Sequence, residues 1–289
     1  MTSNQYNRPN FIIIGAMKCA TSTLHDQLAN QPGVFMSTPK EPNFFSDDKI
    51  YTQGLDWYSN LFAGANAQLC GESSTHYTKF PTYPETINRM LAYGLHDIKL
   101  VYVMRDPIDR LVSHYIHEWS QGVINTDIDS ALDKHPELIN YSRYFYQLDH
   151  YLKHYPAENI LPVFFHSLRD EPQQELERIC TFLNYQGNPQ WDFNMESRNV
   201  SAQRIRKFPL YDLLIESAPL AAARRILVPR KLRDSIKQKL TMQKRPKLSD
   251  QSRQRLVDIF DKDLRSLGEI LGSDLSYQSF SAASGKTKP

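Results

Sequence analysis

The chain has 289 residues, of which 40% are hydrophobic and 23% are charged, and its formal net charge is +2. This composition is typical of a globular protein and excludes an intrinsically disordered chain, while the length suits one large α/β domain. The apolar runs near residue 1 are too short to span a bilayer and follow no basic region. We therefore expect neither a signal peptide nor stable membrane insertion.

The cysteines indicate a reducing environment. Cys19, Cys70 and Cys180 are odd in number and widely spaced, with no metal-ligand pattern. We therefore expect free thiols and a cytoplasmic location.

Short apolar, β-branched runs alternate with helical patterns along most of the chain. Strands are predicted at 10–15, 68–72, 99–104 and 160–165. Helices are predicted at 22 to about 30, 84–91, 107–119, 142–155 and from 172 onward. This alternation predicts an α/β fold with a mostly parallel sheet flanked by helices.

The pattern changes after about residue 187. We expect a mainly helical carboxyl-terminal part over 187–276, with a helix at 251–271, and a frayed tail over 277–289. No linker interrupts the chain, so we expect a single domain over 1–289.

The segment between the first strand and the first helix has the features of an anion-binding loop. It runs from Gly15 to Thr23 and contains Lys18 and several hydroxyl groups. Small residues let the backbone approach a ligand, and the amide groups at a helix start can cradle an anion. The loop of nucleotide triphosphatases ends in Gly-Lys-Ser/Thr, whereas Lys18 precedes the first hydroxyl by three residues. An ordinary turn with a solvated lysine is the alternative.

A second basic group follows the strand at 99–104. Arg105 stands at the end of this strand, and Ser113 falls on the next helix. A guanidinium can grip a phosphate with paired donors, and the carboxyl ends of parallel strands lie at one edge of a sheet. Taken alone, Arg105-Asp106-Pro107 is equally typical of an ion pair and a turn.

Together, Lys18-Cys19-Ala20-Thr21-Ser22-Thr23-Leu24 and Arg105-Asp106-Pro107 with Ser113 resemble two motifs of the sulfotransferase family. The likeness is to bacterial and heparan sulfate sulfotransferases, and it covers about residues 10–185. It implies a P-loop-like fold and 3′-phosphoadenosine 5′-phosphosulfate (PAPS) as donor, with adenosine 3′,5′-bisphosphate as product and no metal. The residues implied to hold the donor are Lys18, Cys19, Ala20, Thr21, Ser22, Thr23, Arg105 and Ser113.

The chain also departs from the family pattern. Ala20 replaces a frequent glycine, Asn43 a common histidine, and Ser73 the lysine of heparan sulfate enzymes. The last two changes argue against a heparan-like acceptor. The family's Lys-Gly loop near the end is missing, and we expect Arg204 and Arg206 to replace it at the donor.

The resemblance also implies the catalytic groups. Glu41 matches the catalytic glutamate of glycan-modifying relatives and would act as general base, worth roughly 10²–10⁴-fold in rate. Lys18 would stabilise the departing phosphate. His76 is the rival base, because other sulfotransferases use histidine.

We therefore expect transfer of a sulfuryl group from PAPS to a hydroxyl or amine of a glycan or small metabolite. The alternatives are a small-molecule kinase of the P-loop type and a non-catalytic binder of adenosine bisphosphate.

The positive charge gathers in one segment. Ten of the 34 Lys and Arg residues lie between Arg224 and Lys247, with Asp234 as the one acid among them. We hypothesise that this segment contacts an anionic donor or acceptor, against the alternative of a solvated face. Nucleic acid is disfavoured as a partner, because aromatic residues do not interleave the run.

Overall fold

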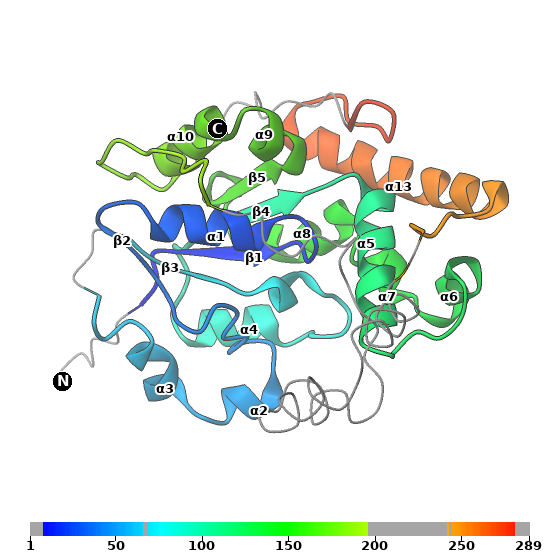
Figure 1. Ribbon diagram of the computed structural model, residues 1–289. Helices are drawn as coiled ribbons and strands as arrows, with labels where there is room; N and C mark the ends of the chain where they lie inside the picture. The colour runs from blue at the N-terminus through cyan, green and yellow to red at the C-terminus, as the bar shows by residue number, and fades with distance from the viewer. Residues whose placement is uncertain (1–7, 66–68, 196–241, 243, 281–289) are drawn as a thin grey trace, which may run out of the picture.

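A parallel sheet forms the centre of the computed structural model, which describes residues 8–65, 69–195, 242 and 244–280 (Figure 1). The five strands are arranged in the order β2-β3-β1-β4-β5, and every neighbouring pair is parallel. Their bounds are β1 Phe11–Gly15, β2 Val34–Met36, β3 Leu69–Ser73, β4 Lys99–Met104 and β5 Ile160–Phe164.

Helices cover the sheet. Those that connect the strands are α1 Thr21–Ala29, α2 Asp48–Tyr51, α3 Leu55–Asn60, η1 Thr75–Thr78, α4 Thr86–Ala92, α5 Pro107–Ser120, α6 Ile128–Lys134, α7 Glu137–Asn140, α8 Tyr144–Leu152 and η2 Ala157–Asn159. Those after β5 are α9 Phe165–Asp170, α10 Pro172–Phe182 and α13 Asp250–Leu271. The connection from β1 to β2 runs across the sheet in the opposite direction to that from β3 to β4. Right-handed crossovers therefore place α1 and α4 on opposite faces (Figure 1).

The expected α/β fold is confirmed, and the four predicted strands lie within two residues of their expected ends. β2 was not predicted, because a strand of three residues carries almost no periodic signal. The helix expected at 142–155 is shorter and spans Tyr144–Leu152. The helix expected at 251–271 is α13.

The prediction of a frayed tail is wrong for residues 277–280. The backbone N–H of Tyr277 donates to Asp261 over 2.9 Å. Phe280 is buried, and its ring centroid lies 5.4 Å from that of Phe164 and 6.1 Å from that of Tyr144. An aromatic side chain that fits the core outweighs the polar character of its neighbours. Residues 281–289 lie outside the described part.

The main hydrophobic core extends from the sheet to α13. The buried side chains of Leu264 and Leu267 on α13 belong to the same cluster as those of β1 and β4. This shared core supports our proposal that the chain forms a single domain. Of the carboxyl-terminal part predicted to be mainly helical, residues 196–241 lie outside the described part.

Candidate active site

A cavity of about 920 Å³ lies at the edge where the parallel strands end. Its walls come from the loop after β1, from η1 after β3, from Arg105 after β4 and from Phe165 after β5. The charged or titratable side chains that line it are Lys18, Glu41, His76, Lys79, Arg105, His117, Glu118, Arg169, Asp192 and Arg245. This volume falls in the range of about 300–1,000 Å³ that is usual for small-molecule sites.

The loop after β1 reaches this cavity through an unusual backbone. Lys18 and Ala20 have positive φ angles of 73° and 64°, in the left-handed region that favours glycine. Glycine would adopt this conformation at position 20 without the steric cost that a side chain adds. Ala20 is also the N-cap of α1 and has no side-chain acceptor, so the first-turn amide groups of α1 can bind an anion.

The structure brings most of the predicted loop residues to the cavity. Its lining includes Lys18, Ala20, Thr21, Ser22 and Thr23. Cys19 is the exception, because its side chain is fully buried in the core.

Arg105 leaves the end of β4 and reaches the same cavity. Its guanidinium lies over the Phe165 ring at 4.9 Å and donates from Nη2 to Asp109 over 3.3 Å. The Nε atom is buried and has no hydrogen-bond partner among the described residues. A buried donor without an acceptor is costly unless a ligand supplies one.

Two further groups line the same cavity as this arginine. Ser113 on α5 is buried and lines the cavity. Arg245 lines it too and donates to the other oxygen of Asp109 over 2.7 Å. Arg245 belongs to the basic segment at 224–247, so at least one member of that segment reaches the site. Arg204 and Arg206 lie outside the described residues.

The Glu41 carboxylate is oriented within the cavity. Its Oε1 accepts from Lys40 over 2.7 Å, and its Oε2 accepts from the Thr75 hydroxyl over 3.1 Å. Burial raises the pKa of Glu41, but the Lys40 ammonium and these hydrogen bonds outweigh burial and hold the pKa below its usual value. Glu41 is therefore ionised at neutral pH and can accept a proton.

His76, the rival base, also lines the cavity but has no such orientation. Its ring stacks on Tyr83 with centroids 4.8 Å apart, and its buried Nδ1 has no hydrogen-bond partner in the described part of the chain. Burial and the nearby Lys79 ammonium lower the pKa of His76 to about 4. Burial likewise lowers the pKa of Lys79 to about 8. Thr75 and Lys79 were not predicted as site residues, since neither belongs to a recognisable motif.

A buried carboxylate holds the segment that carries Glu41. Glu72 on β3 accepts hydrogen bonds from the hydroxyls of Tyr58, Tyr77 and Ser74 over 2.6, 3.0 and 2.8 Å. The Ser74 and Tyr77 oxygens in turn accept from the backbone N–H groups of residues 43 and 45, over 3.0 and 3.4 Å. The left-handed backbone at Glu41 and Asn43 is therefore tied to β3.

Within the described residues, no helix is both long and apolar enough to cross a membrane. They also contain no cluster of three or more His, Cys, Asp or Glu side chains that could hold a metal ion.

The family model described as the sulfotransferase domain matches residues 8–268. The chain therefore belongs to the sulfotransferase family. The resemblance carried by the loop after β1 and by Arg105 is thus confirmed.

Curated relatives match part of the chain. Human heparan sulfate glucosamine 3-O-sulfotransferase 3B1 is 31% identical over 185 residues, which are 61% of this chain and 46% of the relative. Human bifunctional heparan sulfate N-deacetylase/N-sulfotransferase 2 is 28% identical over 196 residues, 61% of this chain and 22% of that protein. The chain thus spans less than half the length of these relatives.

A solved structure supports the fold. The sulfotransferase from Alicyclobacillus acidocaldarius superposes with a TM-score of 0.67 at 23% identity, covering 94% of this chain and 98% of that one.

The buried Glu72 carboxylate predicts a specific pH dependence of stability. Burial raises its pKa to about 7, above the value in the unfolded chain. The associated stabilisation is therefore present at low pH and lost as the pH rises through 7. Relative to Glu72→Gln, the free energy of unfolding of the parent should fall by on the order of 3 kcal/mol between about pH 4.5 and pH 8. Urea unfolding of both proteins across this range measures the difference, and a pH-independent difference would contradict the assignment.

Proposed function

We propose that the chain transfers the sulfuryl group of PAPS to a hydroxyl or amine of an acceptor. One observation carries the proposal: Lys18, Arg105 and Glu41, from three separate segments, line a single cavity at the ends of the strands. Family membership supports it. The acceptor would be a glycan or a small metabolite.

The cationic groups of the cavity suit a donor with two separated phosphates. The loop at 16–23 would hold the 5′-phosphosulfate through its amides, its hydroxyls and Lys18. Arg105 and Ser113 would hold the 3′-phosphate, with the unpartnered Nε of Arg105 as one donor. Arg245, joined to Arg105 through Asp109, supplies additional positive charge at this end.

The reaction follows from the placement of the charges. The acceptor oxygen or nitrogen attacks sulfur, the bond from sulfur to the phosphate oxygen breaks, and adenosine 3′,5′-bisphosphate leaves. Glu41 takes the proton of the acceptor, because its carboxylate is oriented by Lys40 and Thr75. Lys18 stabilises the charge that grows on the departing phosphate oxygen. Positioning in the cavity supplies the rest of the acceleration.

We propose a cytoplasmic location for the chain. The three cysteines form no disulfide. Free thiols support a reducing compartment such as the cytoplasm.

Loss of the Arg105 guanidinium should weaken donor binding. Arg105→Ala should raise the dissociation constant for adenosine 3′,5′-bisphosphate by about 10- to 100-fold, because charge-assisted hydrogen bonds contribute about 1.5–3 kcal/mol. Isothermal titration in excess chelator measures the effect. Arg265→Ala is the matched control, since that arginine is exposed and pairs with Asp261. Equal affinity in the parent and in Arg105→Ala would refute the 3′-phosphate site.

Loss of the Glu41 carboxylate should remove most of the turnover but leave donor binding unchanged. Glu41→Gln keeps the shape of the side chain and removes the base, so turnover should fall roughly 10²–10⁴-fold. His76→Ala should have a much smaller effect.

In the assay, the parent or a variant is mixed with a cell extract and with PAPS labelled with radioactive sulfur. Mass spectrometry then identifies the labelled product. A larger loss in His76→Ala would make histidine the base. Failure of the parent to transfer label, with magnesium-dependent turnover of ATP instead, would indicate a kinase. Donor binding without any transfer would indicate a non-catalytic binder.

A further inference from the structure

Arg105 lies where the sheet no longer supplies hydrogen-bond partners. The pairing of β4 with β5 ends at Met104 opposite Phe164. The backbone N–H and C=O of the next residue are therefore left without a strand partner, in a part of the protein where unpaired polar groups are costly.

A single hydroxyl group satisfies both of these backbone atoms. The Tyr144 hydroxyl donates to the Arg105 carbonyl oxygen over 2.6 Å and accepts from the Arg105 N–H over 3.1 Å. Binding both atoms restricts the backbone torsions of Arg105, and these set the direction in which its side chain leaves the chain. Phenylalanine at position 144 would keep the ring but leave both atoms unpaired.

The same hydroxyl contacts the loop after β1. The Cys19 sulfur lies 3.9 Å from the Tyr144 oxygen. The thiol also lies 3.9 Å from the Met17 carbonyl oxygen, to which it can donate its single proton. Burial raises the pKa of the Cys19 thiol to about 11, so the sulfur keeps its proton at neutral pH. Tyr144 thus joins the two loops that line the cavity.

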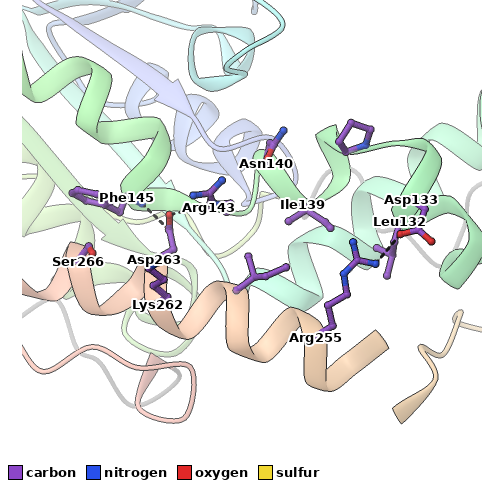
Figure 2. A pocket seen from close by; sticks show the side chains of 12 residues that line it. Leu132, Asp133, Ile139, Asn140, Arg143, Phe145, Arg255, Lys262, Asp263 and Ser266 are labelled. Carbon is purple, nitrogen blue, oxygen red and sulfur yellow. Dashed lines mark hydrogen bonds and ion pairs between the residues drawn. The ribbon is translucent and has the colours of Figure 1, made fainter. Parts of the chain in front are cut away.

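The position of Tyr144 is in turn determined by α13. Asp263 accepts from the backbone N–H groups of Phe145 and Tyr146 over 2.9 and 3.1 Å, and so caps the first turn of α8. Figure 2 shows Asp263 directed from α13 toward Phe145 and Arg143, at a second cavity of about 570 Å³. Phe280, which follows α13, stacks on the Tyr144 ring.

We propose that Tyr144 is a positioning residue that holds Arg105 in the conformation that recognises the 3′-phosphate of the nucleotide. Asp263 supports it by fixing the start of α8. The inference rests on the proposed function, because it assumes that Arg105 binds the 3′-phosphate. Tyr144 itself does not touch the nucleotide, since its side chain is fully buried.

The test compares two nucleotides that differ by the 3′-phosphate. Isothermal titration gives the dissociation constants of adenosine 3′,5′-bisphosphate and adenosine 5′-monophosphate for the parent and for Tyr144→Phe. The preference of the parent for the bisphosphate should fall by about three- to tenfold in Tyr144→Phe, as expected for loss of one positioning interaction. Asp263→Asn should shift the preference in the same direction.

Tyr151→Phe is the matched control. Tyr151 lies on the same helix, is fully buried and donates its hydroxyl to the Tyr77 carbonyl oxygen over 2.7 Å, away from Arg105. It should leave the nucleotide preference unchanged. An unchanged preference in Tyr144→Phe, or an equal loss of affinity for both nucleotides, would overturn the inference while leaving the proposed function intact. A parent protein without any preference for the bisphosphate would overturn the inference together with the 3′-phosphate site.

Discussion

The parallel hydrogen bonds between β1 and β4 bring together the two segments that we propose to bind the donor. Ile13 lies opposite Val101, and the ladder continues where the N–H of Ala16 donates to the carbonyl oxygen of Val103 over 2.8 Å. Both strands therefore end at the same edge of the sheet, and the chain leaves each strand toward the same cavity. Lys18 and Arg105 line the same cavity because this pairing holds. A shift of the register would separate the groups proposed to bind the two ends of one donor molecule.

Backbone strain concentrates around the same cavity. Among the described residues, five other than glycine have positive φ angles, and four of them, Lys18, Ala20, Glu41 and Asn43, stand in the two segments that line or support the site. Each such conformation costs on the order of 1–3 kcal/mol and persists only where the surroundings enforce it. The hydrogen bonds that run from Glu72 through Ser74 and Tyr77 to the backbone of residues 43 and 45 provide that constraint on one side. The second strained segment, the loop that contains Lys18 and Ala20, is held at its two ends by β1 and α1.

Much of this arrangement was predictable from the sequence, because it depends on strong local signals. A buried apolar run that ends in glycine, followed by hydroxyl residues, specifies both a strand and a loop. The features that could not be predicted from the sequence depend on contacts between segments that lie far apart along the chain. The role of Tyr144 comes from its hydrogen bond to Arg105, which is 39 residues away in the sequence. A periodic pattern of residues cannot reveal such a contact. Arg245 is one of ten similar cations in its segment, so composition alone could not select it. Phe280 was assigned to a tail because its neighbours are polar, although its ring completes the core.

A crystal structure of the protein with adenosine 3′,5′-bisphosphate would show directly where the two phosphates bind. We expect the 5′-phosphate on the amides and hydroxyls of the loop at 16–23 beside Lys18. We also expect the 3′-phosphate within hydrogen-bond distance of Arg105 and Ser113, with Glu41 facing the open part of the cavity. A nucleotide bound in the opposite orientation, or away from these residues, would contradict the proposed donor site.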